Sequence, residues 1–506
     1  MPDYKTYDLI VAGGGTAGLI AAARLAERGV HPKTGEKLKI AVLEAGPYWK
    51  GEQRAGYGHP LRRQMTPQIN WEDFATVPNF PWMFGLQMVG GCSMHWGANA
   101  FLPEDIDYEQ WVQETGVDWT KEKIKESLDD VVNAYHVHES PDEAFGRGDW
   151  LFKQASESLG FKVLKYTHAR KNCLYCGFRG DGHGCKYDAR GTSLWYAPIA
   201  EQNGVEIIPN AMVEKVIIEK KGARGVVKGV FYKEKGVTKE ARADKVVVSC
   251  GYAGSPVLLA KSGYGPRNEA PNLIVENANV GKNLDGDTRA GFPALFDEQI
   301  KEDSGRGSIG AFYFFTDVGP DAVWRVRIAS PDIGAILYPH EAAVSEFAPQ
   351  FGKAHMDFMR TAITRVGGGN ATVTKPASNV KGSVNLQSGA KNYPGSEMID
   401  KRLRESFELI REIYKRMGAK KIGGDRLPKT FKAMGGGHSN GTCRAGVDRK
   451  NSVIDSKFES HDVDGLFIAD ASSIPRAISN NVGLIAAVMG AYAARRIVAA
   501  YFTRGA

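Results

Sequence analysis

Residues 7–18 read Tyr-Asp-Leu-Ile-Val-Ala-Gly-Gly-Gly-Thr-Ala-Gly, an apolar segment that runs directly into a cluster of glycines. The apolar part predicts a buried strand, and the Ala- and Leu-rich stretch after it predicts a helix. The glycines at 13, 15 and 18 permit a tight turn, a close approach of backbone N–H groups to a pyrophosphate, and close packing of helix on strand. The stretch therefore predicts the start of a dinucleotide-binding parallel sheet.

A second apolar strand, residues 39–44, ends at Glu44, where a carboxylate can bind both hydroxyls of a ribose. Glu44 lies 26 residues after Gly18, later than the usual spacing of about 20. The insertion at residues 31–38 accounts for the difference. A third apolar strand, residues 245–250, lies far downstream, so we expect distant pieces of chain to complete the sheet.

The composition is that of an ordinary globular protein with room for two or three cores: 506 residues, 42% hydrophobic and 24% charged. The net charge is only +7, with 65 basic residues scattered among 58 acidic ones, so we infer no nucleic-acid partner. The amino terminus enters a strand without the pattern of a secretion signal. The longest apolar run, residues 482–494, is too short for a bilayer of roughly 30 Å, and we expect a buried helix and no transmembrane segment.

A motif at residues 435–444 supplies candidates for proton transfer. Residues 435–444 read Gly-Gly-Gly-His-Ser-Asn-Gly-Thr-Cys-Arg, and Asn480 and Asn481 precede the apolar helix. Oxidation of an alcohol requires a group that accepts the hydroxyl proton, and a histidine has a suitable pKa. An asparagine cannot act as a base at neutral pH, so its task would be to hold the substrate oxygen by hydrogen bonding.

Several segments, in order along the chain, resemble the glucose-methanol-choline family of FAD-dependent oxidoreductases. Residues 43–47, Leu-Glu-Ala-Gly-Pro, resemble the end of the second strand in FAD enzymes, and residues 89–97, Val-Gly-Gly-Cys-Ser-Met-His-Trp-Gly, resemble the loop that contacts the flavin. Residues 250–260, 279–284, 378–386 and 463–472 resemble further family segments. The resemblance covers the whole chain and implies FAD as the cofactor, His438 as the catalytic base and Asn481 as its partner.

The resemblance and the glycine motif together give a set of expected cofactor-binding residues. They are Gly13, Gly15, Thr16, Ala17, Gly18, Glu44, Ala45, Gly90, Gly91, Ser93, His95, Trp96, Gly97, Ala98, Val213, Cys250, Gly251, Asp470, Ala471, Asn481 and Val482.

His95 raises the question of a covalent flavin. The sequence Ser93-Met-His-Trp96 resembles the Ser-Thr-His-Trp of pyranose 2-oxidases, in which the histidine carries a covalent link to the flavin. Sugar dehydrogenases of the same family also have His-Trp here, without such a link. Both alternatives stay open, and we expect Trp96 to form an aromatic wall beside the cofactor.

Cys173, Cys176 and Cys185 lie in one glycine-rich segment beside His183, a spacing that suits iron–sulfur or zinc ligation. Some bacterial glucose dehydrogenases of this family carry a three-iron cluster in a comparable segment, although residues 178–179 are Phe-Arg where related sequences often continue with Cys. An iron–sulfur cluster, a zinc ion, and free or locally paired cysteines are therefore three alternatives. The first would imply electron transfer to a cytochrome or another protein.

The predicted fold is α/β: a discontinuous Rossmann-like FAD-binding domain and a second, α+β substrate-binding domain built on an antiparallel sheet. We assign residues 1–105, 201–288 and 431–506 to the FAD-binding domain. Residues 106–200 would form substrate-domain helices and the Cys-rich loop, and residues 289–430 the rest of the substrate-binding domain.

Alternating segments at 309–315 and 324–329 predict the strands of the substrate-binding domain. A stripe of Leu403, Phe407, Ile410 and Tyr414 predicts a helix that stops at Gly418. Alternation over 213–219 and 225–232 predicts a small antiparallel insertion in the FAD-binding domain.

The sequence therefore predicts an FAD-dependent oxidoreductase that oxidises a secondary hydroxyl of a sugar or glycoside, at carbon 2 or 3, to a ketone. The sugar rests on the resemblance of residues 91–96 and of the cysteine segment to pyranose oxidases and glycoside 3-dehydrogenases. The alternatives are oxidation of a non-sugar alcohol and a flavin-containing lyase of the same family. The expected partners are the sugar substrate and a cytochrome or small accessory subunit. We expect a cytoplasmic location, with periplasmic co-export beside a signal-bearing partner as the alternative.

Overall fold

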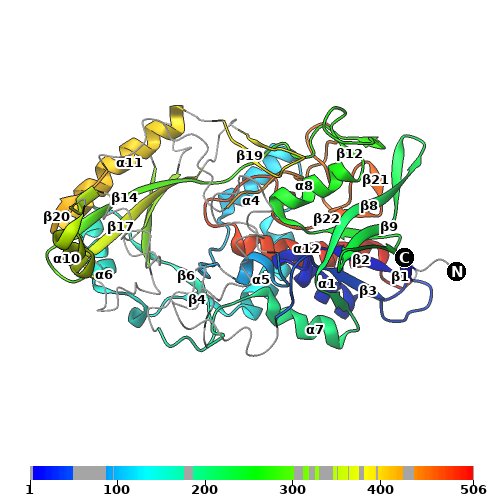
Figure 1. Ribbon diagram of the computed structural model, residues 1–506, viewed down its shortest axis with the longest axis horizontal. Helices are drawn as coiled ribbons and strands as arrows, with labels where there is room; N and C mark the ends of the chain where they lie inside the picture. The colour runs from blue at the N-terminus through cyan, green and yellow to red at the C-terminus, as the bar shows by residue number, and fades with distance from the viewer. Residues whose placement is uncertain are drawn as a thin grey trace.

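The computed structural model describes residues 4–49, 87–94, 96–175, 185, 187–300, 311–317, 325–329, 346–349, 351–362, 364–374, 381–394, 397–424 and 438–504. Two parts lie side by side along the long axis of the molecule (Figure 1). A parallel sheet with its helices forms one part, at the right of the view, and an antiparallel sheet covered by a long helix forms the other.

The parallel sheet has five strands in the order β22-β11-β2-β3-β7. Their bounds are Leu466–Ile468 (β22), Val246–Val248 (β11), Leu9–Ala12 (β2), Ile40–Leu43 (β3) and Glu206–Ile208 (β7), and every neighbouring pair is parallel. The first four strands are wholly buried, as expected where helices cover both faces. Because the strands come from both ends and the middle of the chain, the predicted discontinuous domain is confirmed.

Three helices pack around this sheet: α1 (Thr16–Arg28), α8 (Gly251–Lys261) and α12 (Gly483–Tyr501). Helix α12 runs from the middle of the molecule to the C-terminus (red in Figure 1) and packs against α1 and α5 (Lys121–Ala134). It does not end near Ala494 but continues through Arg495 and Arg496, which lie on its exposed side.

The expectation that this apolar segment is too short to cross a membrane was wrong, because α12 has 19 residues and meets the length and hydropathy of a membrane span. It is the one described helix that does. However, 67% of its apolar window is buried inside the molecule. Its apolar surface therefore belongs to the core of the first part, as we expected.

A second, smaller sheet extends the first part. It consists of β8 (Ala211–Lys221), β9 (Arg224–Glu234) and β10 (Val237–Arg242), with β1 (Lys5–Thr6) and β21 (Val463–Asp464) at its edges. Strands β8, β9 and β10 pair antiparallel, so the predicted antiparallel insertion is confirmed.

The other part is built on a six-stranded antiparallel sheet in the order β20-β14-β17-β16-β15-β5. The bounds are Ala419–Ile422 (β20), Thr288–Phe296 (β14), Val366–Thr374 (β17), Arg325–Ala329 (β16), Phe312–Asp317 (β15) and Leu164–Lys165 (β5). Helix α11 (Glu397–Arg416) lies along the sheet (Figure 1) and buries the predicted stripe of Leu403, Phe407, Ile410 and Tyr414 against it. Gly418, at a φ of +84°, follows the end of the helix as predicted.

Helices α4 (Asp105–Thr115) and α5, which we expected among the substrate-domain helices, share the core of the parallel sheet instead. The cause is a cluster of large aromatic side chains. Trp119 stacks on Phe458 with ring centroids 4.5 Å apart and meets Tyr492 of α12 edge-on. By contrast, α6 (Arg147–Ser158) packs against α11 and the antiparallel sheet.

The remaining described elements are short, apart from α10. They are η2 (Gly91–Met94), β4 (Val137–Glu139), η3 (Asp142–Ala144), β6 (Thr167–Ala169), η4 (Ser193–Tyr196), α7 (Ala197–Gln202), β12 (Tyr264–Gly265), β13 (Val275–Glu276), α10 (Gly352–Ala362), β18 (Ser383–Val384), β19 (Lys391–Asn392) and η5 (Ala471–Ser473).

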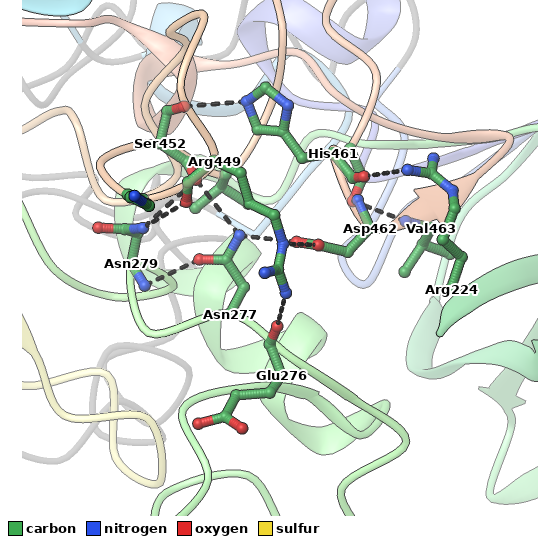
Figure 2. A network of polar contacts seen from close by, with 12 residues as sticks. Arg224, Glu276, Asn277, Asn279, Arg449, Ser452, His461, Asp462 and Val463 are labelled. Atoms are coloured by element: carbon green, nitrogen blue, oxygen red, sulfur yellow. Dashed lines mark hydrogen bonds and ion pairs between the residues drawn. The ribbon is translucent and has the colours of Figure 1, made fainter. Parts of the chain in front are cut away.

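A polar network centred on Asp462 fixes the segment between the catalytic motif and strand β22 (Figure 2). The buried carboxylate of Asp462 accepts hydrogen bonds from Asn277 Nδ2 at 2.8 Å and Tyr264 OH at 2.9 Å, and also pairs with Arg449. His461 beside it exchanges a hydrogen bond with Ser452 Oγ at 2.9 Å. This network holds residues 449–463 against β12 and β13.

The contact between α1 and α12 yields a stability prediction. A Cβ atom at Gly490 would lie 2.2 Å from the backbone oxygen of Ala17, so Gly490→Ala must push the two helices apart. We expect a loss of about 1–3 kcal/mol, seen as a melting temperature lower by several degrees. Gly148→Ala in α6 is the matched control, because its Cβ would meet Ile300 at an ordinary 3.5 Å. Equal melting temperatures for the two variants would contradict this account of the packing.

Candidate active site

The glycine turn after β2 is as tight as the sequence predicts. Gly13 has a φ of +101°, and a Cβ atom there would lie 2.5 Å from the backbone oxygen of Ser249. A Cβ at Gly18 would lie 2.0 Å from the backbone oxygen of Gly13. Neither position accepts a larger residue without movement of the backbone, so the turn brings α1 directly onto the end of the sheet.

The amino terminus of α1 is suited to an anion. Its N-cap residue is Gly15, no side chain caps the helix, and the first turn contains no acidic residue. The first backbone N–H groups of a helix, here those of Thr16, Ala17 and Gly18, lack intrahelical acceptors and carry the positive end of the helix dipole. A pyrophosphate would satisfy both.

The second glycine cluster lies against the first, although the two are far apart in sequence. The N–H of Gly90 donates to the backbone oxygen of Gly14 at 2.8 Å, and the N–H of Ser93 donates to Thr16 Oγ1 at 3.2 Å. Gly91 comes so close to Gly15 that a Cβ at Gly91 would lie 2.8 Å from the Gly15 Cα. The two loops expected to bind the cofactor, at residues 13–18 and 90–93, are therefore in direct contact.

Glu44 lies at the end of β3, as predicted, and its carboxylate braces the turn. Oε2 accepts the N–H of Gly14 at 2.8 Å, and Oε1 accepts the N–H of Gly46 at 2.9 Å. The side chain is 5% exposed, and burial raises the pKa of the carboxyl group. The carboxylate also accepts the backbone N–H of Ala45, and the lone pair that remains can accept a ribose hydroxyl. Ala45 follows on the same loop, and Val213 lies two residues after Ala211, whose N–H donates to the Glu44 backbone oxygen at 2.8 Å.

Cys250 and Gly251 follow the end of β11, beside the glycine turn at Gly13. Solvent reaches the side chain of Cys250, yet the protein surrounds it closely enough for burial to raise the pKa of its thiol. At Gly251 a Cβ atom would meet nothing within 4 Å. The open position at Gly251, the N-terminus of α1 and a carboxylate that can bind a ribose lie in the same region, which suits an extended dinucleotide such as FAD.

The carboxylate of Asp470 has a structural role. It accepts the N–H of Gly251 at 2.8 Å, the hydroxyl of Ser255 at 2.5 Å and the N–H of Ser472 at 2.7 Å. It thus caps α8 and the short helix that begins at Ala471. The side chain of Asp470 is therefore committed to protein groups, and only the backbone of residues 470–471 remains for the cofactor.

Trp96 packs against the start of α12, beside Asn481 and Val482. A Cβ at Gly483, the first residue of α12, would lie 2.8 Å from the Trp96 ring, and the indole N–H donates to the backbone oxygen of Gly191 at 2.8 Å. Gly97 and Ala98 continue this segment, and Ala98 is wholly buried. His95 lies outside the described residues, so the question of a covalent flavin stays open.

The geometry of His438 is that of a positioned base. Its Nδ1 lies 2.7 Å from Oδ2 of Asp287, a carboxylate with a side chain only 3% exposed. A carboxylate can only accept, so Nδ1 must carry the hydrogen and the lone pair of the neutral ring lies on Nε2. Asp287 therefore fixes both the tautomer and the orientation of His438.

Backbone pairing brings these two residues together from opposite ends of the chain. Asp285 and Asn440 exchange two backbone hydrogen bonds of 3.0 Å in an antiparallel bridge. In such a pairing, the residue two positions after Asp285 lies opposite the residue two positions before Asn440, on the same face. These residues are Asp287 and His438.

Asn481 lies two residues before Gly483, the first residue of α12, and an arginine of the antiparallel sheet holds its amide. Arg327 of β16 donates from Nη2 to Asn481 Oδ1 at 2.9 Å and from Nη1 to Asn480 Oδ1 at 3.2 Å. Asp107 of α4 anchors the turn at residues 479–481. Its Oδ1 accepts both the N–H and the hydroxyl of Ser479 at 2.8 Å. Burial raises the pKa of Asp107 to about 6.

Lys391 of β19 is a further charged group near Asp287. Its Nζ lies 5.1 Å from the centre of the Tyr252 ring, and its charge interacts with that of Asp287. Burial lowers the pKa of Lys391 from 10.5 to about 8, although Asp287 opposes this effect. At neutral pH the ammonium form still predominates.

The cysteine segment remains a prediction. Cys173 and Cys185 are not disulfide-bonded, and Cys173 packs against the hydrophobic core of the antiparallel-sheet part. The described residues contain no group of three or more His, Cys, Asp or Glu side chains that could hold a metal ion. Cys176 and His183 lie outside the described residues, so nothing supports the iron–sulfur cluster or the zinc ion.

Sequence reasoning missed Asp287, Arg327 and Lys391. A signal existed for Asp287, which follows the segment 279–284 directly, but only the antiparallel bridge shows that it reaches His438. Arg327 lies in a strand that the sequence did predict. Only the structure shows that its side chain is buried, at 1% exposure, which indicates a role inside the molecule. No sequence pattern distinguishes Lys391 from the many surface lysines.

The fold and the site together define a two-domain, dinucleotide-dependent oxidoreductase. The family comparison is more specific: residues 7–288 match the N-terminal model of the GMC oxidoreductases and residues 380–490 match the C-terminal model. The chain belongs to the GMC (glucose-methanol-choline) oxidoreductase family, and it is an FAD-dependent oxidoreductase that acts on CH–OH groups.

Similar proteins differ in the substrates that their names give. A long-chain-alcohol oxidase of Arabidopsis thaliana is 24% identical over 545 residues, which cover 98% of this chain and 68% of the plant protein. An oxygen-dependent choline dehydrogenase of Pseudomonas fluorescens is 26% identical over 592 residues, covering 99% of this chain and 97% of that protein. Neither name concerns a sugar, so the family branch that we expected is not shown.

Solved structures share the fold. A formate oxidase variant from Aspergillus oryzae superposes with a TM-score of 0.72 at 17% identity, covering 99% of both chains. Pyridoxine 4-oxidase from Mesorbium loti gives a TM-score of 0.68 at 16% identity, covering 97% of this chain and 98% of the other. The predicted two-domain α/β architecture is thus confirmed.

Lys391 makes the stability of the protein depend on pH in a defined window. Because its folded pKa of about 8 lies below 10.5, the unfolded chain binds more protons between these values and stability rises with pH there. Below pH 8 the full penalty of the buried charge is present. Lys391→Met should therefore stabilise the protein at pH 7 by at most about 3 kcal/mol.

The measurement is chemical denaturation at several pH values between 7 and 11. The difference between Lys391→Met and the wild type should shrink as the pH passes from 8 to 10.5. Lys353→Met, at a side chain 89% exposed, is the control and should change nothing. A difference that stays constant across the window would refute the buried-charge interpretation.

Proposed function

We propose that this protein oxidises a secondary hydroxyl of a sugar or glycoside to a ketone, with His438 as the base and Asn481 as the group that holds the substrate oxygen. The observation that supports the role of His438 as the base is the 2.7 Å hydrogen bond between its Nδ1 and Asp287 Oδ2. It leaves the lone pair of His438 on Nε2, the atom that would accept the hydroxyl proton.

The two domains have separate tasks in this reaction. FAD, when bound along the Gly13–Gly18 turn and Glu44, supplies the hydride acceptor. His438 takes the hydroxyl proton on Nε2, and the buried carboxylate of Asp287 stabilises the imidazolium that results. Asn481 donates from its amide to the substrate oxygen as negative charge develops there.

The charges around the site support a polar substrate. Arg327 is wholly buried and contacts Asn481. Lys391 is mostly charged at neutral pH and interacts with Asp287, the partner of His438. Two cations beside the site oppose a quaternary ammonium substrate such as choline. An alkyl chain laid over Asn480, Asn481 and Arg327 would leave their polar groups poorly solvated. A polyhydroxylated ring offers hydrogen-bonding groups to the same residues.

Removal of the base should abolish turnover while the cofactor stays bound. We expect His438→Ala to retain FAD, judged by its visible absorbance, and to lose turnover by several orders of magnitude, since the proton acceptor is gone. His461→Ala is the control, because His461 belongs to the separate network of Figure 2. Near-normal turnover in His438→Ala would sink the assignment.

Asp287→Asn tests the orientation of the base. An asparagine amide can donate to Nδ1, which would move the ring hydrogen to Nε2 and remove the lone pair from the reacting side. We therefore expect a loss of roughly 100-fold or more in the rate of flavin reduction, with FAD content unchanged. A rate within threefold of the wild type would show that Asp287 does not set the tautomer.

The substrate class is tested by anaerobic titration of the purified flavoprotein with a panel of sugars and glycosides, long-chain alcohols and choline. Loss of the flavin absorbance bands with a sugar or glycoside, and ketone product at a ring carbon, is the expected result. Bleaching by long-chain alcohols or choline alone would replace the sugar with a non-sugar alcohol. A flavin that no alcohol bleaches would favour the non-redox lyase alternative instead.

A further inference from the structure

We propose that Arg327 is a positioning residue that fixes the amide of Asn481 with its N–H groups toward the substrate oxygen. The proposal rests on the proposed function of Asn481 and adds a residue from the other domain to that site. It explains why a wholly buried guanidinium reaches across from the antiparallel sheet to the start of α12.

The hydrogen-bond pattern determines which way the amide faces. A guanidinium has only donors, so it can contact an asparagine amide only through the oxygen. Arg327 Nη2 lies 2.9 Å from Asn481 Oδ1, and Nη1 lies 3.2 Å from Asn480 Oδ1. With its oxygen committed to Arg327, Asn481 can present only its amide N–H groups to a substrate.

The same contact places a positive charge behind the donor. Arg327 is 1% exposed, and its guanidinium lies 4.8 Å from the centre of the Phe101 ring and 5.9 Å from that of Tyr166. A hydrogen bond from a cation to an amide oxygen polarises the amide and strengthens its own N–H as a donor. The donor is thereby suited to the developing negative charge of an alcohol that loses its proton to His438.

The planar guanidinium is needed for both contacts. It holds the amide oxygens of two consecutive residues with two neighbouring nitrogen atoms, a geometry that a lysine ammonium on a flexible stem does not reproduce. Asn480 is 5% exposed, so this second contact also satisfies a buried oxygen. The pair of contacts links the antiparallel sheet to the turn that precedes α12.

A double-mutant cycle tests whether Arg327 acts through Asn481. Arg327→Gln should slow anaerobic flavin reduction roughly 10- to 100-fold, with FAD content and melting temperature close to those of the control. In an Asn481→Ala background the same substitution should cost less than about threefold, because the group through which it acts is absent. Equal losses in both backgrounds, or an unchanged rate in Arg327→Gln, would overturn the proposal.

Arg402→Gln is the matched control. Arg402 is a buried arginine of α11 in the same domain, and it pairs with Glu405 of the same helix at 2.8 Å. If Arg327→Gln does not bind FAD, Arg327→Lys keeps the charge and loses the fork. A wild-type reduction rate in Arg327→Lys would overturn the role given to the two-pronged contact of the planar guanidinium.

A second measurement does not depend on turnover. Hydrogen exchange of the backbone over residues 477–486 should become faster in Arg327→Gln and stay unchanged in Arg402→Gln, since Arg327 anchors this turn. Unchanged exchange in Arg327→Gln would overturn the proposal. If the wild-type flavin is not reduced by any alcohol, the proposed function fails, and exchange alone then decides whether Arg327 positions Asn481.

Discussion

The buried carboxylate of Asp285 joins the two segments that carry the catalytic residues. Its side chain is 1% exposed, pairs with Lys381 Nζ at 3.0 Å and accepts the N–H of Ala477 at 3.2 Å. Its backbone pairs with Asn440. One residue thus ties the loop of His438 to the turn before Asn481, and loss of one partner of such a buried pair typically costs about 3–5 kcal/mol.

The two domains contribute different chemical groups to the site. The cofactor part supplies backbone N–H groups at the start of α1, a carboxylate at Glu44 and an open position at Gly251, which together suit a dinucleotide. The antiparallel sheet supplies the buried cation of Arg327, and β19 supplies Lys391. The buried carboxylate of Asp287 contacts His438 and makes the histidine a base with a defined lone pair.

Local patterns predicted what depends on local physics. The turn at Gly13–Gly18, the stripe from Leu403 to Tyr414 and the antiparallel insertion all followed from periodicity or backbone sterics. The helix after Asn481 proved longer than its apolar run, because Arg495 and Arg496 can extend from the surface of a helix whose other face is buried. The place of α4 and α5 depended on Trp119 stacking on Phe458, and the partners of His438 and Asn481 depended on pairings between residues more than 150 positions apart. Such long-range contacts leave no periodic signal in a single sequence.

The central claim is that His438, oriented by Asp287, and Asn481 face the reacting side of the flavin. A crystal structure of the FAD-bound protein at a resolution that defines hydrogen bonds tests it most directly. The account predicts that Nε2 of His438 and the amide nitrogen of Asn481 both face the bound flavin, while Nδ1 keeps its hydrogen bond to Asp287. A His438 ring turned away from the flavin, or an Asp287 that has left Nδ1, would contradict it.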